Sequence, residues 1–155
     1  MNGVIEKTAK TMDQTQLFIL KNLLLFFSKL ELAGTANGVL GQETDAFFLE
    51  NHRKPDIAYY SDEQIKRAKN GENQVPKFII EIISKTDNIN RVNRKVENYF
   101  AAGVKIVWHI FPEQHMVHVY EDSTHIRVCK GTAICSAEAV IPGFAMPAEL
   151  IFQEL

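Results

Sequence analysis

Three short stretches decide the fold of this chain: PDIAYY at residues 55–60, KFIIEIIS at residues 77–84 and RKVENY at residues 94–99. The first two are rich in β-branched and aromatic residues, which is typical of strands. Pro55 suits the first position of a strand because it has no backbone N–H to donate to a sheet. We therefore predict a strand that starts at Asp56, a second strand buried on both faces around Glu81, and a helix that carries Lys95.

The carboxylates of Asp56 and Glu81 are the unusual feature of this pattern. A bare carboxylate in a buried strand is costly to desolvate unless it is paired, neutralised or bound to a metal. Two strand carboxylates with a lysine on the next helix therefore indicate a divalent metal site. Two plainer interpretations stay open: Asp56 as a turn or cap residue, and Glu81 with Lys95 as a buried ion pair.

The composition is that of an ordinary folded protein. The chain has 155 residues, of which 46% are hydrophobic and 23% charged, and this fits one domain and argues against disorder. The net charge of −2 argues mildly against a large basic surface for nucleic acid. Cys129 and Cys135 form no disulfide framework, so we expect a reducing compartment and a cytoplasmic protein.

Residues 17–32 predict the first helix. Their apolar run is interrupted by polar residues at positions 21, 22, 28 and 29, well short of the ~20 residues that a membrane span needs. We expect a core helix whose apolar surface could also serve a homodimer interface, and no membrane partner.

The strands before Asp56 are predicted to be short. Residues 3–6 indicate a first strand whose own pairing strand is missing from the chain. Residues 39–43 and 44–49 read as strands that lead to a polar turn at residues 50–54. With the Asp56 strand they would make an antiparallel meander.

The elements after Asp56 complete an α+β pattern. Ser61 is a good N-cap for a short helix, and Asp87 or Asn88 can cap the helix that carries Lys95. Residues 105–111 read as another buried strand, so the unit that begins with the Glu81 strand predicts a parallel, right-handed crossover. Residues 116–120 and 125–129 alternate as a hairpin. The order of elements predicts a single α+β domain with a mixed sheet and flanking helices.

Two further groups of residues have bland explanations. Basic residues cluster locally and are most simply solvated helix faces: Lys66, Arg67 and Lys69 in one group, and Lys85, Arg91, Arg94 and Lys95 in another beside the proposed site. Histidines crowd the later strands and suggest zinc, but no helical His-x-x-x-His pair is present. These histidines are His109, His115, His118 and His125.

Several motifs, taken in order, resemble the Uma family of restriction-endonuclease-like proteins, within the wider PD-(D/E)-x-K nuclease group. The resemblance extends from about Gly3 over most of the chain. It is carried by PD at residues 55–56, EIIS at residues 81–84, Lys95 and Tyr99, GV at residues 103–104, Trp108, and PGF at residues 142–144. In the wider group the lysine lies two positions after the acidic residue, where this chain has Ile83. The Uma pattern resembles a version in which the next helix supplies the lysine.

The resemblance implies a restriction-endonuclease-like fold over residues 1–155 and a Mg²⁺- or Mn²⁺-dependent endonuclease acting on DNA. It implies Asp56, Glu81 and the backbone carbonyl of Ile82 as metal ligands. Lys95 would orient the attacking water or stabilise the transition state. The outer-shell candidates are Glu43, Ser84 and Tyr99, and the candidate DNA-binding residues are Lys85, Arg91 and Arg94.

The chain departs from the family pattern at several positions. It has Lys85 where a proline is common, Arg91 and Phe111 where aspartates are usual, and Gln16 near the place of a histidine. A family acidic residue in an N-terminal strand also has no counterpart. These departures keep a second hypothesis open: a catalytically inactive module that serves dimerisation or nucleic-acid binding.

Overall fold

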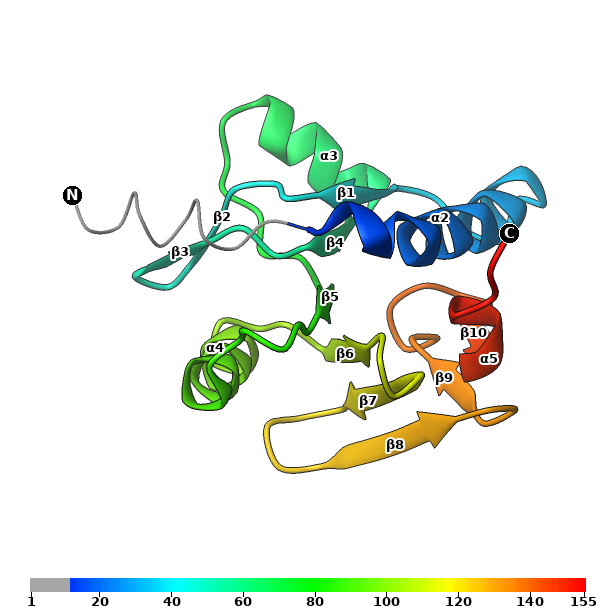
Figure 1. Cartoon of the computed structure of the whole chain (residues 1–155). Coiled ribbons are helices and arrows are strands. Elements are labelled where there is room, and N and C mark those ends of the chain that lie inside the picture. Colours follow the sequence, from blue (N-terminus) through cyan, green and yellow to red (C-terminus); the bar gives the residue numbers. More distant parts are fainter. Residues whose placement is uncertain (1–11) are drawn as a thin grey trace.

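A six-stranded mixed sheet lies at the centre of the structure, a computed structural model that describes residues 12–155 (Figure 1). Its spatial order is β1-β4-β5-β6-β7-β8. The strands are β1 (Val39–Gln42), β4 (Ile57–Tyr60), β5 (Phe78–Ile82), β6 (Ile106–Phe111), β7 (Met116–Tyr120) and β8 (Ile126–Lys130). The pair β5–β6 is parallel and every other pair in this sheet is antiparallel. The predicted mixed sheet and the predicted parallel crossover are confirmed.

Two small ribbons and several helices complete the described part of the chain. The ribbons pair β2 (Ala46–Phe48) with β3 (Asn51–Arg53), and β9 (Ile134–Ser136) with β10 (Ala145–Pro147). The helices are η1 (Gln14–Gln16, a 3-10 turn), α2 (Leu17–Leu32), α3 (Asp62–Lys69), α4 (Ile89–Ala101) and α5 (Ala148–Ile151). Within residues 12–155, none of these helices is long and apolar enough to cross a membrane. The elements form one α+β domain.

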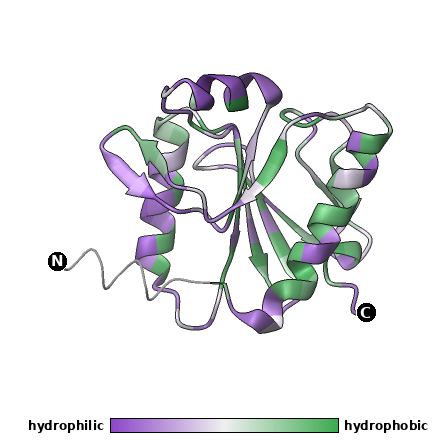
Figure 2. Cartoon of the chain, turned by 90° about the horizontal axis from the view of Figure 1, so that it is seen from above, coloured by the Kyte–Doolittle hydropathy of each residue, from purple (hydrophilic) through white to green (hydrophobic). Residues whose placement is uncertain are grey.

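The alternation of side chains along the sheet divides the core into two layers, with helices on both sides of the sheet (Figure 2). Ile80 and Trp108 face the layer of α2, whereas their neighbours Ile79 and Val107 face the layer of α4. Because each strand in the middle of the sheet is covered on both faces, β5 is buried at all five positions, as its apolar sequence predicted.

Helix caps account for where α3 and α4 begin. The Ser61 side chain accepts a hydrogen bond from the Gln64 N–H, and the Gln64 side chain accepts one from the Ser61 N–H, which is a complete capping box. The Asn88 side chain caps α4 by accepting from the N–H groups of Asn90 and Arg91. The predicted N-caps are therefore confirmed.

The predicted turn at residues 50–54 is wrong. Asn51–Arg53 forms β3, and the turn is confined to Leu49 and Glu50, with a positive φ of 57° at Leu49. The predicted meander is also wrong in its order, because β1 pairs directly with β4. The β2–β3 ribbon is inserted in the sequence between these two strands and pairs only with itself. All three side chains of β3 are polar, so its sequence lacks the apolar alternation of a strand, although its backbone pairs with β2. The strand predicted at residues 3–6 lies outside the described residues.

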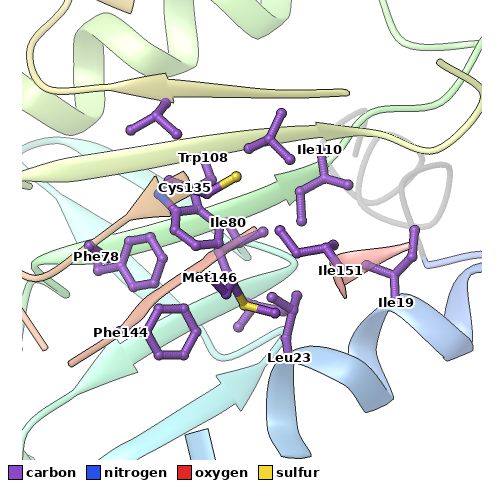
Figure 3. Close-up of a cluster of buried hydrophobic side chains, with 14 of the residues drawn as sticks. Ile19, Leu23, Phe78, Ile80, Trp108, Ile110, Cys135, Phe144, Met146 and Ile151 are labelled. Carbon is purple, nitrogen blue, oxygen red and sulfur yellow. The ribbon is translucent and has the colours of Figure 1, made fainter. Parts of the chain in front are cut away.

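An aromatic cluster joins the C-terminal segment to both the sheet and α2 (Figure 3). The ring of Phe144 lies 5.8 Å from that of Phe78 and 5.6 Å from that of Trp108, measured between centroids. On its other side it lies 5.4 Å from Phe26 and 6.5 Å from Phe27 of α2. This ring therefore fills the space between helix and sheet.

We expect Phe144→Ala to lower the free energy of unfolding by about 3–5 kcal/mol, because it empties a fully buried aromatic site. Chemical denaturation monitored by circular dichroism measures this loss. The matched control is Phe47→Ala on the β2–β3 ribbon, where the ring is 53% exposed and the expected cost is about 1 kcal/mol or less. Equal losses in the two variants would contradict the central position of Phe144.

Candidate active site

Antiparallel pairing of β4 with β5 brings the two predicted carboxylates to one end of the strands. Ile57 pairs with Ile80, so Asp56, just before β4, lies next to Glu81, near the end of β5. Ala58 and Ile79 belong to the layer of α4. Because side chains alternate along a strand, Asp56 and Glu81 also face that layer. The structure therefore brings together residues that lie on separate strands, as predicted.

The Asp56 carboxylate is held by the backbone of the neighbouring strand. Its side chain is buried at 3% exposure, and its Oδ2 atom accepts a hydrogen bond of 2.8 Å from the N–H of Ile82. This bond excludes the interpretation of Asp56 as a simple turn residue. It also fixes Asp56 beside the residue whose carbonyl was predicted as a metal ligand.

The Glu81 carboxylate is equally buried and is bonded on one oxygen only. Its Oε2 atom accepts a 2.6 Å hydrogen bond from the Tyr99 hydroxyl and lies 3.9 Å from the Lys95 Nζ atom. Its Oε1 atom is buried without a hydrogen-bond partner among residues 12–155. Buried carboxylate oxygens are normally satisfied. An unbonded oxygen beside a second carboxylate fits the requirement of a hard divalent cation for oxygen ligands.

Tyr99 acts as a hydrogen-bond donor at all ordinary pH values. Burial, together with the negative charge of Glu81 and the hydrogen bond to it, raises the pKa of Tyr99 well above its usual value. The spacing of apolar residues along α4 predicts Ile89 on the buried face of this helix and Tyr99 on an adjoining flank. This prediction is wrong for both residues, since Ile89 is 62% exposed and Tyr99 is fully buried. The hydroxyl of Tyr99 reaches a carboxylate inside the core, which periodicity alone does not reveal.

A pocket of about 580 Å³ opens beside Asp56 and Ile82. Ser84 and Asp87 line it, and the Ser84 N–H donates a 2.7 Å hydrogen bond to the Asp87 carboxylate. Thus the predicted outer residue Ser84 does lie at the site, together with Asp87, which the sequence predicts only as a possible helix cap. Asp87 follows the strand by a few residues, and a polar loop after a buried strand is the signal that points to it.

Glu43 comes close to Asp56 through its backbone. The Glu43 N–H donates a 3.1 Å hydrogen bond to the carbonyl of Asp56, and the Glu43 side chain accepts a bond of 3.3 Å from the Met12 N–H. Glu43 does not line the pocket. The structure therefore places the Glu43 backbone beside Asp56 and leaves Glu43 out of the pocket lining.

The predicted DNA-binding residues lie in two places. Lys85 lines the pocket and forms an exposed ion pair of 3.3 Å with Glu113. Arg91 and Arg94 are exposed residues of α4 that do not line it. The structure thus brings one of the three to the pocket.

No motif of the sequence points to Arg53, and His109 enters only the zinc alternative. His109 is buried and lies opposite Glu81 in the parallel β5–β6 pair, with its ring 4.8 Å from that of Tyr120. His118 lies directly opposite His109 in the antiparallel β6–β7 pair, whereas His115 stacks on Phe152. In residues 12–155 no three His, Cys, Asp or Glu side chains are grouped as a metal site. A metal at this site would therefore rest on two carboxylates with backbone oxygen and water.

Comparisons with known proteins identify the family and the fold of this chain. A family model named Uma2 and described as a putative restriction endonuclease matches residues 1–149. Among solved structures, the chain is similar to a putative nuclease of DUF820 from Anabaena variabilis ATCC 29413, with a TM-score of 0.76 at 20% sequence identity. The similarity covers 92% of this chain and 83% of that one, which confirms the predicted fold. None of the curated proteins compared with the sequence matches it.

Tyr99→Phe tests the hydrogen bond to Glu81. At pH 7 we expect the free energy of unfolding to fall by about 1–3 kcal/mol, because a buried oxygen loses its donor. The folded pKa of Tyr99 is raised, so its contribution is complete below the unfolded pKa of about 10 and is lost as pH rises above it. The difference between wild type and variant should therefore narrow above pH 10 in chemical denaturation.

Tyr60→Phe is the matched control. The Tyr60 hydroxyl forms no hydrogen bond within residues 12–155, although burial raises its pKa to about 12. We expect this variant to keep the wild-type stability at pH 7. A Tyr99→Phe variant whose loss stays constant between pH 7 and pH 11 would show that Tyr99 is not the protonated donor described above.

Proposed function

We propose, since the chain belongs to the Uma2 family of putative restriction endonucleases, that it is a metal-dependent endonuclease that hydrolyses phosphodiester bonds in DNA. One observation carries the proposal. Two buried carboxylates on adjacent strands, Asp56 and Glu81, lie together beside Lys95, and an oxygen of Glu81 has no hydrogen-bond partner in the described part of the chain.

Asp56, Glu81 and the backbone carbonyl of Ile82 are the proposed ligands of Mg²⁺ or Mn²⁺. All three offer oxygen, the donor that these hard cations prefer. A divalent cation held there would supply Lewis-acid polarisation of a phosphate oxygen and of an attacking water. The family resemblance and the unbonded Oε1 atom of Glu81 support this assignment.

We assign to Lys95 the role of orienting the attacking water or stabilising the negative charge of the transition state. Its ammonium lies on the α4 side of Glu81, and its side chain is 19% exposed, so a substrate can approach it. Tyr99 holds Oε2 of Glu81 and leaves Oε1 available for the cation. Ser84 and Glu43 are proposed outer-shell residues that help to position the metal ligands. Lys85, Arg91 and Arg94 would contact DNA phosphates.

Metal titration and DNA cleavage on the same samples test this proposal. We expect calorimetry to detect Mn²⁺ or Mg²⁺ binding to the wild type and not to Asp56→Asn or Glu81→Gln, because each substitution removes a ligand charge. Plasmid and single-stranded DNA should be cut by the wild type and by neither Asp56→Asn nor Glu81→Gln. Lys95→Met should keep metal binding while cleavage falls by about 10²–10³-fold, the cost of losing one group that stabilises the transition state.

Glu97→Gln is the matched control, since Glu97 is an exposed carboxylate of the same helix α4. It should bind metal and cut DNA as the wild type does. Metal binding that survives in both Asp56→Asn and Glu81→Gln would overturn the ligand assignment. Absence of cleavage by the wild type with bound metal would favour the alternative function.

The alternative is a catalytically inactive module with the same fold. Gln16 and Phe111 favour it, because both line the pocket at places where the family pattern usually has a histidine and an aspartate. Such a module would use the fold for dimerisation or for nucleic-acid binding. It predicts DNA binding or dimer formation without metal-dependent cutting.

We further propose that the chain forms a homodimer through α2. Leu17, Leu25 and Leu32 are 50%, 51% and 89% exposed, and their spacing of eight and then seven residues (25 − 17 and 32 − 25) keeps them on one side of the helix. Sedimentation should show a dimer for the wild type and a monomer for Leu25→Glu, with Lys66→Glu on the exposed face of α3 as a control. Monomeric wild type would contradict this part. A cytoplasmic location stays a prediction from cysteine usage.

A further inference from the structure

We infer that Arg53 is a substrate-binding residue of this site and holds a phosphate group of the DNA backbone beside Glu81 and Tyr99. This inference rests on the proposed function and assigns a residue to it that lies outside the motifs described above. It depends on three observations: the face on which Arg53 lies, the atom of its guanidinium that has no partner, and the charges around it.

The β2–β3 ribbon directs Arg53 toward the site. Arg53 pairs with Ala46 across the ribbon, and directly opposed residues of an antiparallel pair lie on the same face. Ala46 and its neighbour Phe48 belong to the core layer of α4, where the ring of Phe48 lies 4.8 Å from that of Tyr99. Arg53 therefore lies on the side of the ribbon that faces Tyr99, and the chain continues from it to Asp56.

The guanidinium of Arg53 is incompletely bonded. Its Nε atom is buried and has no hydrogen-bond acceptor among the described residues. Its NH1 group donates a bond of 3.2 Å to the carbonyl of the adjacent His52. A guanidinium carries five N–H donors in a planar fork that matches two oxygens of a phosphate. Since the residue as a whole is half-buried, an external phosphate can still reach it.

The charges around Arg53 favour an anionic ligand. Phe48, on the face of the ribbon that Arg53 shares, contacts the ring of Tyr99, so the positive charge of Arg53 lies on the side of the ribbon that faces the Glu81–Tyr99 pair. The Lys95 Nζ atom lies 3.9 Å from Oε2 of Glu81, the atom that accepts the hydrogen bond from Tyr99. Two cations thus flank the Glu81–Tyr99 pair, and none of the ion pairs within residues 12–155 neutralises Arg53.

The adjacent Lys54 supplies a matched control. It is also cationic, but its ammonium lies 4.0 Å from the Asp45 carboxylate and 49% of its side chain is exposed. Lys54 therefore has a carboxylate partner within the chain, and Arg53 has none in its described part. If simple positive charge on this ribbon attracts DNA, removing either residue should have the same effect.

The test measures the affinity of a fluorescein-labelled DNA duplex by anisotropy in Ca²⁺ between 50 and 200 mM salt, with intact DNA verified on a gel. We expect Arg53→Gln to weaken binding about tenfold and to reduce the slope of log K against log salt by about 0.9, the loss of one phosphate contact. Arg53→Lys should keep the slope and bind with intermediate affinity, because it retains charge without the planar fork. Lys54→Gln should resemble the wild type.

Equal affinities and slopes for Arg53→Gln and Lys54→Gln would overturn the inference, and so would a wild type that binds no duplex. Circular dichroism checks that each variant is folded. If Arg53→Gln does not fold, the intermediate affinity expected of Arg53→Lys becomes the test. Failure of the nuclease proposal gives a different result. In that case the wild type binds DNA and loses affinity with Arg53→Gln, but it does not cut DNA with Mg²⁺ or Mn²⁺.

Discussion

The burial of the Glu81 carboxylate in the middle of the sheet is the constraint on which the rest of the site depends. A charge at 3% exposure on a strand of isoleucines is unfavourable unless other groups compensate for lost water. The Tyr99 hydroxyl and the Lys95 ammonium supply this compensation from one helix, four residues apart and therefore on the same side of it. The packing of α4 over the sheet therefore also supplies the polar groups of the site.

The mixed direction of the strands explains why this compensation occurs at one end of the sheet. β4 runs against β5, so the beginning of one strand meets the end of the other, and Asp56 reaches the backbone of Ile82. The parallel pair β5–β6 then requires a crossover, and α4 is that crossover. A purely antiparallel hairpin after Glu81 would bring no helix back over the carboxylates.

Much of this arrangement could be predicted from the sequence because local signals agreed with the fold. The apolar run around Glu81 and the caps Ser61 and Asn88 depend on short-range chemistry, and the structure follows them. The strand Asn51–Arg53 could not be predicted, because its three side chains are all polar and show no apolar alternation, and only its backbone pairing with β2 makes it a strand. Arg53 at the site was missed for the same reason. Tyr99 lies three residues after Val96 on the buried face of α4, but a pattern that counts only apolar residues passes over its hydroxyl, and Ile89 is exposed at the first position of the helix.

The contacts of Phe144 also have a consequence for how the protein forms. This ring packs against Phe26 of α2, so the core on that face of the sheet joins residues 118 positions apart (144 − 26). Contacts of such long sequence separation slow folding, because the intervening chain must be ordered before they form. During synthesis, α2 leaves the ribosome long before residue 144 is made. Until then Phe26 lacks this partner, so part of the apolar face of α2 is exposed in the nascent chain.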